Sequence, residues 1–89
     1  MLKITKIKES ESDVLLKLEG KITNQWAALL DRECHFYIAQ KKTVSLDCSN
    51  VDFVDGKGVA VLNNLPRKHV TLMSTPGFVT ELLQTGGRR

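Results

Sequence analysis

The residues best suited to chemistry lie in one short segment, Asp55-Gly56-Lys57-Gly58, which an apolar run follows. Asp55 is suited to accept hydrogen bonds from the free N–H groups at the start of a helix. Gly56 and Gly58 would let another backbone or a ligand approach closely. The Gly-Lys-Ser/Thr ending of a nucleotide-binding P-loop is absent, because Val59 follows Gly58. The segment therefore predicts a helix start that can contact a ligand or a partner.

The lysine in this segment has two interpretations. A cation beside the positive end of a helix dipole is unfavourable by roughly a few tenths of a kcal/mol, and full exposure of Lys57 to solvent would keep that cost small. Alternatively, Lys57 and the exposed helix N–H groups bind an acidic partner or a phosphate. An anionic ligand, such as a nucleotide, stays open as a hypothesis at this position.

Neither cysteine has the spacing of a metal or redox site. Cys34 and Cys48 form no CxxC pair, and no histidine lies at a metal-site spacing from them. Cys34 and His35 are adjacent in a predicted helix, so their side chains diverge by roughly 100° and cannot readily share a metal. Both thiols are expected to be reduced and in or near the core. No metal and no cofactor are expected.

No group of residues has the composition of a catalytic site. His69 precedes an apolar alternation and is expected at a strand edge, because no nucleophile or orienting group can be assigned to it. Asp47 and Asp52 could resemble a carboxylate pair, but hydrogen bonding at strand ends explains them better. Because no set of nucleophile, base and oxyanion donors emerges, the chain is not expected to be an enzyme.

Length and composition indicate one globular domain. The chain has 89 residues, of which 42% are hydrophobic and 26% are charged, which is close to the average of globular proteins. Its longest apolar runs are only a few residues, whereas a membrane-spanning helix needs roughly 20. The N-terminus has no apolar stretch typical of a secretory signal. A cytoplasmic location is therefore expected.

The positive charge does not indicate a nucleic-acid-binding protein. Thirteen basic residues face ten acidic ones, and two of the basic residues are Arg88 and Arg89, which follow Gly86 and Gly87. Nucleic-acid-binding proteins concentrate their cations and add aromatic residues that stack on bases. Here the charges are interspersed, and most of the few aromatic residues lie in apolar patterns. No nucleic-acid partner is expected.

The first half of the chain predicts a hairpin followed by a helix. Residues 2–8 form a lysine-rich edge strand with a bulge, and residues 14–19 alternate as a second strand that ends at Gly20. Apolar residues at three- and four-residue steps then predict an amphipathic helix whose N-cap is Thr23 or Asn24. Trp26 at its start is either a core residue or an exposed interface residue.

The second half predicts alternating strands and helices. Residues 44–48 form a strand that runs into a turn at Ser49-Asn50. A short apolar helix follows Gly58 and cannot pass Leu65, because Pro66 comes next. Residues 70–72 form the last strand, and residues 78–83 begin a final helix. The order β-β-α-β-α-β-α, with right-handed crossovers, places the helices on one face of a sheet.

The stretch from Val44 to Leu62 resembles the central pattern of STAS domains, the family named after sulfate transporters and anti-sigma factor antagonists. That pattern has an apolar strand ending in Asp-x-Ser, then an aromatic and an aliphatic residue, then Asp-Ser-Ser-Gly at the start of a helix. Asp47-Cys48-Ser49 and Phe53-Val54-Asp55 match it, as does Gly58 with the apolar helix behind it. Segments on both sides are similar to flanking elements of the family: Leu16 to Ile22, Val70 to Met73 and Val79 to Gly86.

The resemblance implies an α/β fold of STAS type, with a mixed sheet of about four strands and helices packed mainly on one face. It implies a single domain over residues 1–86, followed by a basic tail at residues 87–89. In anti-sigma factor antagonists of this family, a kinase phosphorylates a serine of the Asp-Ser-Ser-Gly segment, which releases the partner. Gly56 and Lys57 stand at the two serine positions here. Phosphorylation at this loop is therefore not expected.

The resemblance also implies a bacterial regulatory module that binds a protein. The expected contact residues are those of the loop at the start of the first helix and of the segment that matches the family's Asp-Ser-Ser-Gly pattern: Thr23, Asn24, Trp26, Asp55, Gly56, Lys57, Gly58 and Val59. The first partner implied is an anti-sigma factor or switch kinase. A second is the ATPase of a lipid-transporting ABC complex, of which the chain would be a small STAS subunit. From the residues alone, a nucleotide- or phosphate-binding domain that uses Lys57 is a third hypothesis.

Overall fold

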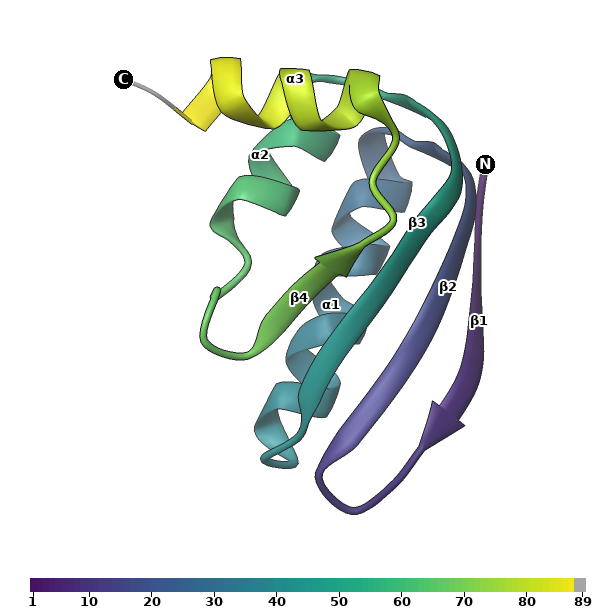
Figure 1. Ribbon diagram of the computed structural model, residues 1–89, viewed down its shortest axis with the longest axis vertical. Coiled ribbons are helices and arrows are strands. Elements are labelled where there is room, and N and C mark those ends of the chain that lie inside the picture. Colours follow the sequence, from purple (N-terminus) through teal and green to yellow (C-terminus); the bar gives the residue numbers. More distant parts are fainter. Residues whose placement is uncertain (88–89) are drawn as a thin grey trace.

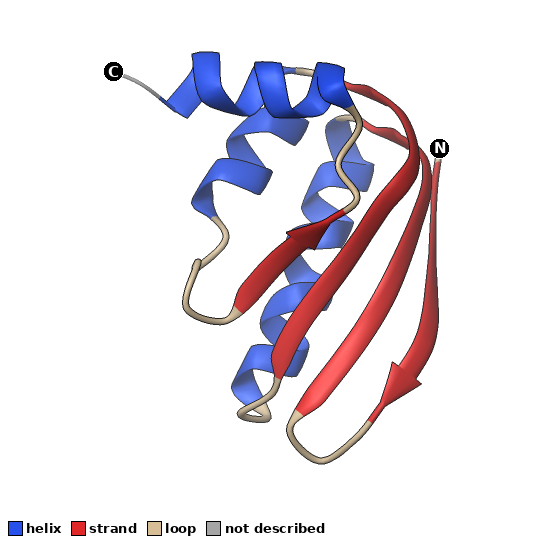
Figure 2. Ribbon diagram, viewed as in Figure 1, coloured by secondary structure: helices blue, strands red, loops and turns tan. Residues whose placement is uncertain are grey.

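The computed structural model describes the backbone of residues 1–87 and the side chains of residues 1–83. The predicted order of strands and helices is confirmed (Figures 1 and 2). The elements are β1 (Leu2–Glu9), β2 (Asp13–Ile22), α1 (Asn24–Ala39), β3 (Thr43–Val54), α2 (Gly56–Asn64), β4 (Val70–Met73) and α3 (Gly77–Gly87). The predicted tail thus begins on the last residue of α3, and Arg88 and Arg89 lie outside the described residues.

The four strands form one mixed sheet in the order β1-β2-β3-β4. β1 and β2 are antiparallel, whereas β2 and β3, and β3 and β4, are parallel. Figure 2 shows α1 and α2 behind the sheet, so that one face is covered by helices and the other is open. The expected fold class, an α/β mixed sheet with helices mainly on one face, is confirmed.

Alternation along the two central strands divides the sheet into an apolar and a polar face. Val14, Leu16 and Leu18 of β2 are almost completely buried, as are the alternate residues of β3 from Val44 to Cys48. Side chains of successive strand residues point to opposite faces, so Lys17 and Asp47 lie on the open face. Burial of this apolar set against the helices is the main stabilising contribution to the fold.

The predicted bulge in the edge strand is confirmed. The pairing of β1 with β2 shifts between Lys6 and Lys8. The residue between them, Ile7, is 54% exposed, because the extra residue turns its side chain away from the core face.

The predicted turn at Ser49-Asn50 is wrong. β3 continues through both residues to Val54, and Asn50 pairs with Glu19 of β2. Local turn preference is overridden because the parallel ladder with β2 supplies the backbone hydrogen bonds of this segment. The preference is still expressed locally: the carboxylate of Asp47 accepts a hydrogen bond from the Ser49 N–H at 3.0 Å. The pairing with β2 shifts register nearby, between Lys17 and Glu19.

One lysine fixes the end of the sheet that lies farthest from α2. Lys42 follows α1, and its Nζ donates to the Glu9 carboxylate at 2.8 Å and to the Ser10 carbonyl at 2.6 Å. Its side chain is only 12% exposed. The hydrogen bond from Lys42, followed by that from Lys6, lowers the pKa of Glu9 to about 2. The β1–β2 hairpin is therefore tied to the loop between α1 and β3.

Candidate functional site

The register of the two central parallel strands brings two distant loops together. Ile22 and Val54, the last residues of β2 and β3, are paired in the sheet. The chain continues from them into α1 and α2, so both helices start at the carboxyl ends of the two central strands. The Asp55 N–H donates to the Ile22 carbonyl at 3.2 Å, which extends the pairing one residue past β3. Residues 23–24 and 55–57 are neighbours for this reason.

Asp55 links the two helix starts directly. Its Oδ1 accepts a hydrogen bond from the Gly58 N–H at 2.8 Å, so the predicted N-cap of α2 is confirmed. Its Oδ2 accepts a second hydrogen bond from the Asn24 N–H at 3.1 Å, at the start of α1. Each helix leaves its first N–H groups without partners inside the helix. A single carboxylate therefore stabilises the N-termini of both helices.

Thr23 is the N-cap residue of α1, as one of the two predicted positions, but it caps the helix without its side chain. Thr23 has the extended backbone of an N-cap residue, but its side chain makes no cap hydrogen bond. Its carbonyl accepts from the Trp26 N–H at 2.8 Å and from the Ala27 N–H at 3.3 Å. Asn24 adopts a φ of +43°, which asparagine tolerates better than most residues. The side-chain acceptor comes instead from Asp55, on another element.

The two glycines of the segment have different roles. A Cβ on Gly58 would overlap the Ile22 carbonyl oxygen and lie 2.6 Å from Cγ1 of Val54. Gly58 is buried, and its lack of a side chain lets α2 approach the end of β2. This confirms the close backbone approach expected there. A Cβ on Gly56 would meet no atom within 4 Å, so the exposed position 56 has room for a larger side chain.

A shallow groove runs between α1 and α2 and passes both helix starts. Its volume is about 520 Å³, and it is lined by Asn24, Gln25, Ala27, Ala28, Asp31, Arg32, Lys57, Ala60 and Val61. Lys57 is exposed, and none of the ion pairs found among the described residues involves it. Alanines supply small side chains to the lining, and Lys57 and Arg32 are its two cations. These two cations outnumber the one acidic lining residue, Asp31, so the arrangement suits contact with an acidic surface.

Residues 5–86 of the chain match the model of the STAS domain. The chain belongs to the STAS domain family. Its fold is similar to the solved structure of the anti-sigma factor antagonist SpoIIAA in its unphosphorylated form, with a TM-score of 0.77 and 16% sequence identity. The similarity covers 96% of this chain and 81% of that chain. A comparison with curated proteins finds no match.

The expected contact residues of this STAS domain differ in exposure. Asn24, Gly56 and Lys57 are exposed, while Gly58 is buried. Thr23, Trp26, Asp55 and Val59 are half-buried, and the side chains of Trp26 and Val59 pack against the core. The structure therefore brings the two predicted segments together and presents three of their residues most fully to solvent.

Sequence reasoning missed the part of the groove that α1 contributes. Gln25, Ala28 and Arg32 are all exposed and line the groove. Their spacing of three and four residues places them on one face of the helix. The polar residues Gln25 and Arg32 beside the apolar stripe indicated the solvent-facing side of the helix, but no sequence signal placed α2 next to them.

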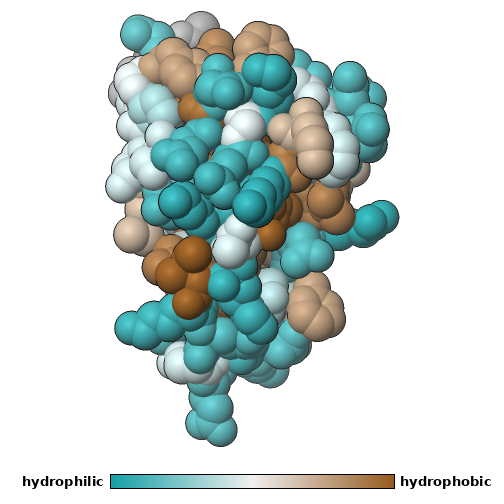
Figure 3. All heavy atoms as spheres, turned by 90° about the vertical axis from the view of Figure 1, so that its right-hand side faces the viewer, coloured by the Kyte–Doolittle hydropathy of each residue, from teal (hydrophilic) through white to brown (hydrophobic). Residues whose placement is uncertain are grey.

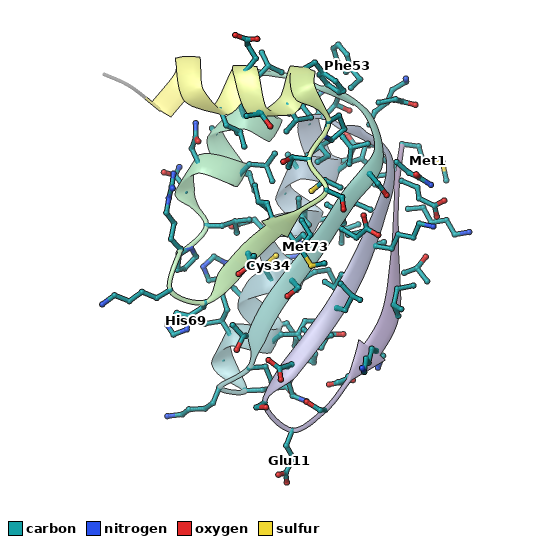
Figure 4. All side chains as sticks on the ribbon, viewed as in Figure 1. Met1, Glu11, Cys34, Phe53, His69 and Met73 are labelled. Atoms are coloured by element: carbon teal, nitrogen blue, oxygen red, sulfur yellow. The ribbon has the colours of Figure 1, made fainter. Side chains whose placement is uncertain are left out.

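The remaining candidate residues of the STAS domain have structural positions. Cys34 and Cys48 are free and buried, as predicted. Burial raises the pKa of Cys34 to about 12 and that of Cys48 to about 11. His69 is exposed directly before β4, as Figure 4 shows. Asp52 pairs with Lys21 of the neighbouring strand at 3.1 Å. No helix among residues 1–87 is long and apolar enough to cross a membrane.

Proposed function

We propose that this STAS domain is a non-catalytic regulatory module that binds a protein partner through the groove between α1 and α2. The observation that carries the proposal is the pair of hydrogen bonds from Asn24 and Gly58 to the carboxylate of Asp55. They fix the two helix starts relative to each other, so that Asn24 and Lys57 belong to one surface. A binding surface held by such bonds loses little conformational freedom when a partner docks.

The local chemistry favours a protein partner over a small anion. A phosphate at a helix N-terminus needs free N–H groups. Here the N–H groups of Asn24 and Gly58 already donate to Asp55, whose negative charge occupies the place of such an anion. The Lys57 side chain is more exposed than that of Asp55 and can contact a carboxylate on a docked protein without displacing Asp55. An acidic protein surface is therefore the proposed ligand.

The proposal includes the loss of a phosphorylation switch. SpoIIAA, whose fold is similar, is described as an anti-sigma factor antagonist with an unphosphorylated form. Residues 55–59 of this chain contain no hydroxyl group. Phosphoserine would bring roughly −1.5 to −2 charge to the start of α2, whereas Lys57 carries a fixed positive charge. We infer that partner binding at this loop is controlled by other means, in a bacterial cytoplasmic setting.

Affinity purification from the native cells tests the proposal. A tagged wild-type protein is compared with Lys57→Glu and with the matched variant Lys68→Glu, whose charge change lies in the exposed loop before β4. We expect one partner to be retained by wild type and by Lys68→Glu and to be depleted at least about ten-fold on Lys57→Glu. Equal recovery of the partner on Lys57→Glu and on wild type would contradict binding through the groove.

The identity of that partner decides between the two partner classes. An anti-sigma factor or switch kinase would assign the STAS domain to transcriptional regulation, and an ABC-transporter ATPase would assign it to lipid transport. Mass spectrometry of the same samples examines residues 55–58. Phosphate found on the side chain of Asp55 or Lys57 would contradict the proposed loss of the switch.

A further inference from the structure

The two edges of the sheet differ in how they are protected from pairing with another strand. The outer strand β1 carries Lys3, Lys6 and Lys8 and contains the bulge, two features that prevent edge-to-edge pairing. Its side of the molecule is largely hydrophilic in Figure 3. The opposite outer strand, β4, has the sequence Val-Thr-Leu-Met, with no charged residue and no register shift. The outer edge of β4 pairs with no strand among the described residues.

The hydrogen-bonding groups on this free edge can be assigned. The Val44 N–H of β3 donates to the His69 carbonyl at 2.7 Å. Alternate residues of a strand direct their backbone groups to the same side, so Thr71 and Met73 also face β3. The Val70 N–H donates to the Pro66 carbonyl at 2.9 Å. The Val70 carbonyl and both backbone groups of Leu72 are therefore directed to the outer edge.

A groove of about 440 Å³ accompanies this edge, between β4, α2 and α3. It is lined by Leu62, Asn63, Leu65, Arg67, Val70, Thr71, Leu72, Thr75, Thr80 and Leu83. Leucines from α2 and α3 supply apolar surface, and Arg67 supplies a positive charge at the end where β4 begins. None of the described residues that line the groove is acidic. The groove thus has unpaired strand groups, walls that combine leucines with threonines, and Arg67, which forms none of the ion pairs found among the described residues.

We propose that an extended, acidic segment of a partner protein adds to β4 as a further strand. Main-chain hydrogen bonds to Leu72 and Val70 would give affinity, as in other cases of strand addition. Every second side chain of the segment would enter the groove, and a carboxylate would pair with Arg67. This site lies beside β4, whereas the α1–α2 groove is lined by residues of the two helices alone, so the two share no lining residue and the proposal is independent of the proposed function.

The first experiment uses a fluorescein-labelled probe peptide with the sequence Glu-Val-Thr-Val-Thr-Val-Thr, and a control in which Lys replaces Glu. We expect the acidic peptide to bind the intact protein, shift the amide resonances of Val70 to Met73 and slow hydrogen exchange at Leu72. The Lys peptide is expected to bind about three-fold more weakly. Arg67→Ala should remove that difference, whereas Lys68→Ala, which does not line the groove, should keep it.

Two N-methylated forms of the acidic peptide separate strand addition from simple apolar contact. One carries methyl groups on its odd-numbered amides and the other on its even-numbered amides, so each blocks one edge. Strand addition predicts that the form methylated on the edge facing β4 binds at least about ten-fold more weakly, while the other form binds as tightly as the unmodified peptide. Equal affinities of the two forms, or no shift in β4, would overturn the proposal. Dimerisation of the protein through β4 without peptide, seen by sedimentation, would overturn it in favour of a second copy.

Discussion

The backbone N–H of Asn24 lies 3.1 Å from Oδ2 of Asp55, although 31 residues separate the two in the chain. The bond exists because Ile22 and Val54 end the paired strands β2 and β3 together. It makes the orientation of α1 depend on a residue of the α2 cap. Removal of this one carboxylate is therefore expected to affect two helices.

Asp55→Ala should lower the free energy of unfolding by about 2 kcal/mol or more, because loss of a single N-cap costs about 1 kcal/mol and two helix starts lose their acceptor. Asp55→Asn keeps one acceptor oxygen and should lose less. Urea unfolding monitored by circular dichroism measures both. Asp52→Ala is the matched control, since its ion pair with Lys21 is exposed and should contribute less than about 1 kcal/mol. Equal losses for Asp55→Ala and Asp52→Ala would contradict the shared cap.

The two glycines of the segment should respond oppositely to the same change. Gly58→Ala places a Cβ against the Ile22 carbonyl and Val54, and such overpacking costs about 1–3 kcal/mol. Gly56→Ala meets no atom within 4 Å and should be neutral or stabilising by about 0.5 kcal/mol, because alanine restricts the unfolded chain. Thermal unfolding of the two variants measures the contrast. A Gly56→Ala variant as unstable as Gly58→Ala would argue against the described packing of α2.

Lys57→Glu should separate stability from binding. The carboxylate is favourable near the N-terminus of α2, so the free energy of unfolding should rise by about 0.5 kcal/mol. Affinity for the acidic partner, once it is purified, should fall at least about ten-fold. Calorimetric titration and urea unfolding of the same preparation give both quantities. A fall in stability together with binding would mean that Lys57 supports the fold instead of the contact.

Lys42→Met should remove a pH-dependent part of the stability. The pKa of Glu9 falls from 4.5 to about 2 in the folded protein, chiefly through the hydrogen bond from Lys42. Because the folded pKa lies below the unfolded value, the contribution is present above pH 4.5 and is lost as the pH falls toward 2.

Urea unfolding of wild type and Lys42→Met at about pH 6 and about pH 3 checks this. The variant should be less stable than wild type at the higher pH, and the difference in their free energies of unfolding should be smaller at the lower pH. Lys21→Met, which removes an exposed ion pair, serves as the control. Its difference in unfolding free energy from wild type should change less between the two pH values. If Lys42→Met lowers the free energy of unfolding equally at both pH values, the loss does not come from the interaction with Glu9.

Both native cysteines should resist alkylation while the protein is folded. Burial raises the pKa of Cys34 to about 12 and that of Cys48 to about 11, so only about 0.1% or less of either is thiolate near pH 8. Iodoacetamide should modify them at least about a hundred-fold faster in urea than in buffer. Ser12→Cys adds a thiol at an exposed site and should react quickly in both. Rapid modification of Cys34 in the folded protein would show that the core opens often.

Local patterns were sufficient to predict most of the fold. Alternation in residues 14–19 and 44–48 identified the central strands, and the cap by Asp55 followed from its position before an apolar run. The error at Ser49-Asn50 arose because both residues favour turns in isolation, while pairing of Asn50 with Glu19 resumes the ladder after the register shift and continues the strand. Context from a distant strand decided the conformation of that segment.

The candidate site was only partly predictable for the same reason. Each helix start could be located, but the bond from Asn24 to Asp55 depends on the register of β2 and β3, which alternation alone does not determine. Trp26 shows a similar limit: its helical spacing was compatible with core and with surface, and the structure makes it half-buried. The residues of the groove that lie on α1 became recognisable only once α2 was placed beside them.

The spatial order of the strands equals their order in the chain. During synthesis the neighbour of each strand therefore emerges from the ribosome before it, and no gap has to be held open for a later segment. The β1–β2 hairpin, whose partners lie close in sequence, can form first and serve as a template. This order is compatible with growth of the sheet from the N-terminal hairpin, in which the last edge to emerge is β4, the one without lysines or a bulge.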